Sequence, residues 1–224
     1  MIDWDKHPLP ERFRHHLSAN NYMPLKDIKF DPFNYPPLYE SIDWSEYFTN
    51  GLPPKYLDIG CGFGWFAMDF STQITDNILG IEVREKAVNY AKTVVESESL
   101  ENINFLWYSV VNGLEFIEKE TLKKIFYFFP DPWFKKKHFK RRAFSVDFLQ
   151  FCYEALEDKG ELLLQTDIDM VQEYHLETLS EFGKFDFKVV SLEEPWDYPT
   201  TNREKDCIKN GFKYYRIIAT KNVR

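Results

Sequence analysis

The sequence has few of the residues that build cross-linked or membrane-embedded proteins. Among its 224 residues there are only three cysteines, Cys61, Cys152 and Cys207, and they show no paired spacing. They indicate neither a disulfide framework nor a zinc site, so we expect a reducing, cytoplasmic setting and no bound metal. No apolar run approaches the length of about 18 residues that a membrane-spanning helix needs, so we expect no membrane contact. The N-terminal residues MIDWDKHPLPER also lack the apolar core of a secretory signal.

The composition favours one large folded core. Hydrophobic residues make up 44% of the chain and aromatic residues 18%, which is enough for a substantial interior. Residues 1–54 hold eight of the twelve prolines and many aromatic residues, a composition typical of irregular structure. We therefore expect an N-terminal extension over residues 1–54 that packs on a main domain over residues 55–224.

The charge of the chain is unevenly distributed. The formal net charge is −8, but residues 135–142 carry six cations and no acid, which leaves 22 cations against 36 acids elsewhere. A basic patch on an acidic body can bind phosphate locally. The alternative is a solvated loop whose lysines only aid solubility. The candidate phosphate contacts are Lys136, Lys137, His138, Lys140, Arg141 and Arg142.

Apolar strand-like runs alternate with amphipathic helix-like segments from residue 55 onward. The expected strands are Tyr56–Ile59, Asn77–Val83, Ile103–Trp107, Lys123–Phe129, Glu161–Gln165, Phe185–Ser191 and Phe212–Thr220. The expected helices are Trp65–Ile74, residues 84–99, Val111–Glu120, Phe144–Leu156 with Ser145 as its cap, and Ile168–Phe182. This alternation predicts an α/β fold with a doubly wound, mostly parallel seven-stranded sheet and helices on both faces.

Glycine is scarce, but three of the nine glycines follow the first expected strand, at Gly60, Gly62 and Gly64. Glycines at such a turn let a ligand approach the backbone at a helix N-terminus. The spacing G-x-G-x-G differs from the G-x-G-x-x-G of dinucleotide binders. No Lys-Ser or Lys-Thr pair follows the glycines, which argues against a P-loop.

Two acids flank this turn. Glu82 ends the second expected strand, 24 residues after Asp58, and an acid at that distance can accept both hydroxyls of a ribose. Asp58 lies near the end of the first strand, where its carboxylate could organise the glycine turn or attract a cationic ligand. Together these features predict an S-adenosylmethionine site. A nicotinamide site and a turn without a ligand remain the alternatives.

The segment from Lys123 to Arg142 combines four unusual features. A fully apolar run leads into Pro130-Asp131-Pro132, and two aromatic residues and the cations follow. Neither proline can continue a sheet ladder, so the run reads as a buried strand whose carboxyl end opens into a rigid loop. Ligands of open α/β sheets bind at that end. Asp131 is therefore the main catalytic candidate.

Four segments carry a resemblance to a known family. LDIGCGFG, FFPDPWFKKKHFKRR, QTD and TTNREKDCIKNG, in this order, resemble the bacterial tRNA (guanine-N7)-methyltransferase family over about residues 55–220. The segment around Pro-Asp-Pro-Trp is distinctive for that family, whereas the glycine motif is common to methyltransferases.

The resemblance implies a Rossmann-like class I methyltransferase that modifies the variable-loop guanine of tRNA, position 46 in tRNA numbering, as a monomer or homodimer. It implies cofactor contacts at Asp58, Glu82 and Asp131. It implies substrate contacts at Lys135, Asp167, Thr201, Asn202, Arg203 and Glu204. Two positions depart from the family. Ser109 stands where an acidic or amide residue usually holds the adenine, but its hydroxyl can still donate and accept a hydrogen bond, so Ser109 stays a candidate cofactor contact. Phe134 replaces a common proline.

The chemistry of guanine N7 is consistent with these roles. N7 carries a lone pair and no proton, so its methylation needs positioning more than a general base. A fixed carboxylate such as Asp131 could hold the reacting centre and stabilise the product cation. Guanine offers two donors on one edge, which a carboxylate can accept, and Glu204 is our first candidate and Asp167 our second.

Two other functions remain open at this point. Asp131-Pro132-Trp133 partly resembles the loop of methyltransferases that act on exocyclic amines, although the second proline is missing. A noncatalytic RNA-binding subunit that kept the fold is the other alternative.

Overall fold

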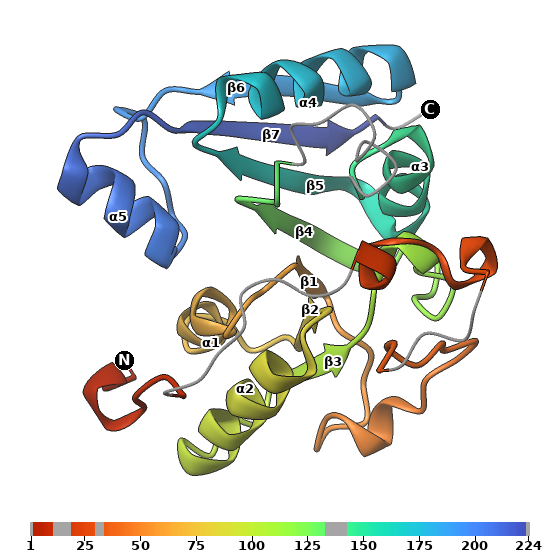
Figure 1. The fold of residues 1–224 in the computed structure, drawn as a ribbon, viewed down its shortest axis with the longest axis vertical. Coiled ribbons are helices and arrows are strands. Elements are labelled where there is room, and N and C mark those ends of the chain that lie inside the picture. The colour runs from red at the N-terminus through yellow and green to blue at the C-terminus, as the bar shows by residue number, and fades with distance from the viewer. Residues whose placement is uncertain (1, 11–18, 30–33, 133–142, 223–224) are drawn as a thin grey trace.

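The computed structural model describes residues 2–10, 19–29, 34–132 and 143–222. Within this part a seven-stranded sheet has the order β3-β2-β1-β4-β5-β7-β6, and β7 runs antiparallel to both of its neighbours (Figure 1). The strands are β1 (Tyr56–Ile59), β2 (Ile78–Glu82), β3 (Ile103–Trp107), β4 (Leu122–Phe128), β5 (Leu156–Thr166), β6 (Phe185–Val190) and β7 (Tyr215–Lys221). The predicted doubly wound, mostly parallel seven-stranded sheet is confirmed.

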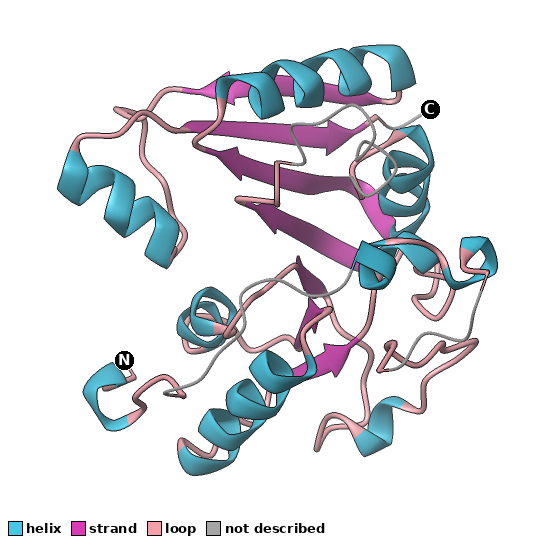
Figure 2. Ribbon diagram, viewed as in Figure 1, coloured by secondary structure: helices cyan, strands magenta, loops and turns pink. Residues whose placement is uncertain are grey.

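Helices cover both faces of the sheet (Figure 2). Because strand side chains alternate between faces, Phe126 of β4 packs in one core cluster and its neighbours Ile125 and Tyr127 pack in the other. The first cluster contains α1 (Trp65–Ser71) and α2 (Glu85–Ser97), and the second contains α3 (Val146–Ala155) and α4 (Asp169–Phe182). The carboxyl ends of β1, β2 and β4 are thus held between two packed layers.

The described part of the N-terminal extension contains only short 3-10 turns. These are η1 (Trp4–Lys6), η2 (Ala19–Tyr22), η3 (Leu25–Asp27) and η4 (Trp44–Glu46). The extension nevertheless packs against the main domain, because its residues Ile2, Trp44 and Phe48 are buried in the core clusters of that domain. The division of the chain at residue 54 stays a prediction.

One local prediction was wrong, and one helix was not predicted. No α-helix spans Val111–Glu120; a 3-10 turn, η5 (Val110–Asn112), ends at Gly113, whose φ of +94° no helix can accommodate. Leu114, Phe116 and Ile117 bury their side chains from turns instead. In addition, an unexpected helix, α5 (Asn202–Asn210), follows Thr201.

Several other features concern the described residues as a whole. None of their helices is long and apolar enough to cross a membrane. Their His, Cys, Asp and Glu side chains form no group of three or more that could hold a metal ion. All three cysteines of the chain are free thiols.

Candidate functional site

The glycine turn is packed tightly on one side and open on the other. Gly64 caps α1 with a φ of +78°, and a Cβ there would lie 2.4 Å from the ring of Phe105. Gly60 has a φ of +74°, and a Cβ there would meet no heavy atom within 4 Å. The backbone is therefore closed towards the core and accessible at Gly60, where a ligand could approach it.

Asp58 lies behind this turn as a buried carboxyl group. Burial, and then the nearby charge of Glu82, raise the pKa of Asp58 to about 8. Asp58 lines a cavity together with Gly60, Gly62, Asn202 and Arg203, which we call the Asp58 cavity. A buried acid that holds its proton near neutral pH would ionise readily if a cation entered.

Glu82, at the end of β2, is held by hydrogen bonds from Arg84, two residues further along the chain, and from the amide of Gly62. Its Oε1 accepts from Arg84 N at 3.0 Å and Arg84 Nε at 2.7 Å, and its Oε2 accepts from Gly62 N at 3.0 Å and Arg84 Nη2 at 3.1 Å. Burial acts to lower the pKa of Arg84, but the hydrogen bond to Glu82 and the charges of Glu82, Tyr22 and Asp131 raise it. Sequence reasoning missed Arg84, although its place two residues after the ribose-type acid was a usable signal.

Asp131 lines a second cavity, which we call the Asp131 cavity, together with Gly60, Glu82, Arg84 and Ser109. The Asp131 side chain is exposed. Asp131 and Gly60 of the glycine turn therefore line the same cavity. The two cavities share the lining residues Gly60, Phe128 and Phe129.

The backbone turns sharply just before Asp131. Phe129 has a φ of +49°, in the left-handed region that non-glycine residues seldom adopt. Its amide N donates to the carbonyl oxygen of Gln165 on β5 at 2.8 Å. This turn ends β4 and directs the Pro130-Asp131-Pro132 loop over the cavity, and such strained residues concentrate at functional sites.

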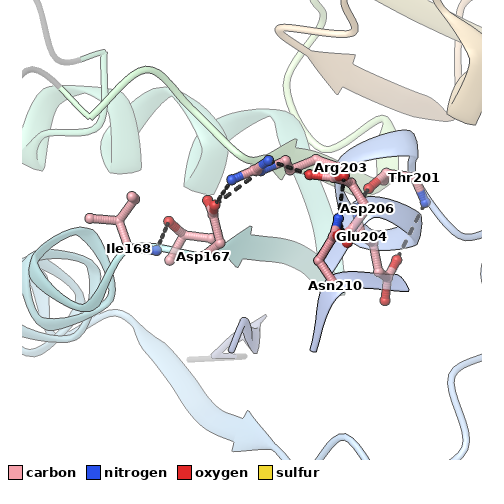
Figure 3. A network of polar contacts seen from close by, with 8 residues as sticks. Asp167, Ile168, Thr201, Arg203, Glu204, Asp206 and Asn210 are labelled. Atoms are coloured by element: carbon pink, nitrogen blue, oxygen red, sulfur yellow. Dashed lines mark hydrogen bonds and ion pairs between the residues drawn. The ribbon is translucent and has the colours of Figure 1, made fainter. Parts of the chain in front are cut away.

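The Thr201–Glu204 segment begins α5 with a capping box (Figure 3). The Thr201 hydroxyl accepts from Glu204 N at 3.1 Å, and Glu204 Oε2 accepts from Thr201 N at 3.3 Å. Glu204 is fully buried and also forms an ion pair with Arg216 of β7. Its carboxylate is therefore engaged inside the protein, and in this conformation it does not meet our expectation of an accessible base-reading acid.

Asp167 and Arg203 form the outer part of the same region. The Nε of Arg203 donates to Asp167 Oδ2 at 3.0 Å, and the Nη1 of Arg203 donates to Asp206 at 2.6 Å (Figure 3). The hydrogen bond to Asp167 raises the pKa of Arg203 above its ordinary value. The carboxyl end of β5 is thereby joined to the N-terminus of α5, beside the Asp58 cavity.

The family model described as "Putative methyltransferase" (Methyltransf_4) matches residues 53–217. The chain belongs to this methyltransferase family. Membership of a methyltransferase family, which the sequence motifs predicted, is thus confirmed.

Named relatives of this methyltransferase family match most of the chain. A tRNA (guanine-N(7)-)-methyltransferase of Prochlorococcus marinus strain MIT 9515 is 34% identical over 206 residues, covering 87% of this chain and 95% of that protein. One from strain NATL1A is 31% identical over 225 residues, covering 96% of this chain and 94% of that protein. The second alignment includes most of residues 1–54, whereas the sequence motifs had indicated a resemblance over about residues 55–220 alone.

Solved structures agree on the fold. A SAM-dependent O-methyltransferase from Thermotoga maritima matches with a TM-score of 0.54 and 19% identity. The match covers 76% of this chain and 60% of that protein. The class I methyltransferase fold predicted for this family member is confirmed.

The remaining predicted site residues of this methyltransferase are Ser109, which the structure describes, and those of the basic segment, which it does not. Ser109 is buried, lines the Asp131 cavity, and donates its hydroxyl hydrogen to the carbonyl oxygen of Asn21 at 3.0 Å. The predicted substrate and phosphate contacts in the basic segment lie outside the described residues; they are Lys135, Lys136, Lys137, His138, Lys140, Arg141 and Arg142.

Proposed function

We propose that this protein transfers the methyl group of S-adenosylmethionine to N7 of a guanine in tRNA. The main structural support is the position of Asp131, at the end of β4, in the same cavity as Gly60 and Glu82. The family match and the names of the relatives over most of the chain support the same reaction.

The residues around the glycine turn fit this cofactor. Asp58 is a buried carboxyl group suited to the ammonium and sulfonium charges of the cofactor, and Gly60 leaves room for a ligand against the backbone. Glu82 ends β2 where a ribose diol would be accepted. When bound, S-adenosylmethionine supplies an electrophilic methyl group on a positively charged sulfur.

Asp131 then acts by position and charge. Guanine N7 attacks with its own lone pair, so no side chain has to remove a proton from it. Positive charge develops on the purine as the methyl group arrives, and the Asp131 carboxylate, carried by a backbone that two prolines restrict, opposes that charge. The chain needs no further acid or base for this step.

Asp167 is the better placed acid for reading guanine. Its side chain is partly exposed, whereas Glu204 is fully buried against Arg216. A carboxylate can accept from both N1–H and the N2 amine of guanine and would repel N1 of adenine. We therefore assign base selection to Asp167, with Arg203 holding it in place. The variable-loop guanine as target, and phosphate contacts along residues 135–142, complete the proposal.

The test is methylation of unmodified tRNA with labelled cofactor, followed by borohydride and aniline treatment, which cleaves RNA at N7-methylguanine. Wild-type protein should give one cleavage, in the variable loop. Asp131→Asn should lower kcat by about 100-fold or more, the usual cost of losing one preorganised electrostatic group. Asp158→Asn removes an exposed carboxylate on β5 and should retain full activity. Label incorporation without aniline cleavage would contradict N7 as the site.

A further inference from the structure

Part of the N-terminal extension belongs to the wall of the Asp131 cavity. Tyr22, the last residue of η2, lines this cavity together with Glu82, Arg84 and Ser109. Tyr22 lies close enough to Arg84 for an ionised Tyr22 phenol to raise the pKa of Arg84. A residue from the irregular first segment of the chain is therefore present where the sequence predicts only main-domain residues.

The segment around Tyr22 is held by a network of hydrogen bonds to the loop after β3. Ser109 Oγ donates to the carbonyl oxygen of Asn21 at 3.0 Å, and Asn112 Oδ1 accepts from Leu25 N at 2.8 Å. Asn112 Nδ2 donates to the Tyr35 hydroxyl at 2.8 Å, and that hydroxyl donates to the carbonyl oxygen of Met23 at 2.6 Å. In Figure 1 the red turn η2 lies beside the light-green stretch between β3 and β4.

The Ser109 hydroxyl is used by this network. Its one hydrogen is donated to a backbone carbonyl of the extension, and both side chains are buried, Ser109 at 4% and Asn21 at 5% exposure. A hydroxyl has a single proton, so Ser109 cannot at the same time donate to a ligand. Its role is to fix the extension.

We propose that residues 19–25 form the outer wall of the cofactor site and that Tyr22 contacts the adenosine of the cofactor. Ser109 and Asn112 are positioning residues that act through this wall. The proposal rests on the proposed function only in taking S-adenosylmethionine as the ligand. The same cavity is also lined by Val83, Val110 and Val111, and apolar walls of this kind can accept a flat purine ring.

The test uses the full chain and S-adenosylhomocysteine, with its Kd measured by titration calorimetry. Tyr22→Ala should weaken binding by about tenfold, as expected for loss of one base-to-aromatic contact. Tyr22→Phe keeps the ring and should bind within about twofold of wild type. Tyr47→Ala is the matched control, because Tyr47 is also a half-buried tyrosine of the extension but lies at the opposite end of β3. An unchanged Kd for a folded Tyr22→Ala protein would overturn the proposal.

A double-mutant cycle separates positioning from direct contact. Ser109→Ala should weaken binding of S-adenosylhomocysteine, whereas Ser109→Thr keeps the hydroxyl and should bind like wild type. The double variant Tyr22→Ala with Ser109→Ala should bind no worse than Tyr22→Ala alone, because both changes remove the same wall. Additive losses would show that Ser109 contacts the ligand itself and would overturn its positioning role. Hydrogen exchange of residues 19–27 should slow on ligand binding in wild type and not in Ser109→Ala. Because these readouts need no tRNA, they can succeed or fail independently of the methylation assay.

Discussion

Arg84 takes two of the four acceptor positions on the Glu82 carboxylate with its guanidinium, and two backbone amides take the other two. A carboxylate offers about four lone-pair sites, so Glu82 has none left for a ribose. The amides of Gly62 and Arg84 are fixed by the glycine turn. The guanidinium is the group that can move, so we expect the ribose hydroxyls to displace it if Glu82 accepts the ribose as we propose.

We therefore predict that Arg84→Met tightens binding of S-adenosylhomocysteine by about fivefold, because the ligand no longer has to break charge-assisted hydrogen bonds. Thermal stability of the ligand-free protein should fall, because Glu82 then loses its ion partner. Lys86→Met removes an exposed cation two residues away and should change neither quantity. Weaker binding by Arg84→Met would mean that Arg84 contacts the cofactor directly.

Asp58 predicts a pH dependence of cofactor binding. Its pKa is raised to about 8 in the free protein, so at pH 7 the carboxyl group is mostly protonated. A cationic ligand lowers that pKa, so binding at pH 7 should release about one proton and tighten as the pH rises to 8. Calorimetry in buffers of different ionisation enthalpy measures the released proton.

The same acid affects stability in the opposite direction. The folded pKa of Asp58 lies above its unfolded value, so its contribution to stability is complete below about pH 4 and is lost as the pH rises through 8. Asp58→Asn cannot ionise, so its Tm relative to wild type should rise between pH 5 and pH 8, and its ligand binding should release no proton. A Tm difference independent of pH would contradict the raised pKa.

Much of the sheet was predictable because buried parallel strands leave continuous apolar runs. β4 is the clearest case, since its run ends at the two prolines that also mark the site. α5 was missed because few of its residues are apolar, yet Thr201 and Glu204, three positions apart, carry the capping-box pattern that starts a helix. The helix expected over Val111–Glu120 failed because Gly113 adopts a φ of +94°.

The contents of the site were harder to predict than its location. The acids at the strand ends could be placed because parallel strands end at one edge of the sheet. The hydrogen bond from Ser109 to Asn21 joins residues 88 positions apart, and Arg216 meets Glu204 across β7 and α5. No local pattern encodes such pairings, so the engagement of Glu204 and the role of Tyr22 emerge only from the packed structure.

Asp167 should control selection of the base. We predict that Asp167→Asn lowers kcat/KM for tRNA by about ten- to a hundredfold, the usual value of one good base contact, and leaves the Kd of S-adenosylhomocysteine unchanged. Asp206→Asn is the matched control, because Asp206 binds the same Arg203 from within α5. Equal losses in the two variants would assign the effect to Arg203 and not to a base contact by Asp167.

The buried pair of Glu204 and Arg216 should act mainly on stability. Both side chains are almost completely withdrawn from solvent, and loss of one partner leaves an uncompensated charge that costs about 3–5 kcal/mol. In a chain of this size each kcal/mol lowers Tm by about 2–4 °C, so Glu204→Gln should lower Tm by roughly 10 °C. Adding Arg216→Met removes the stranded charge, so the double variant should be more stable than the sum of the single losses predicts. Glu181→Gln, on the exposed face of α4, should leave Tm unchanged. Two results together would contradict this structural role: a wild-type Tm for Glu204→Gln, and methylation of adenine-substituted tRNA by that variant. They would show that the Glu204 carboxylate separates from Arg216 and reads the base itself.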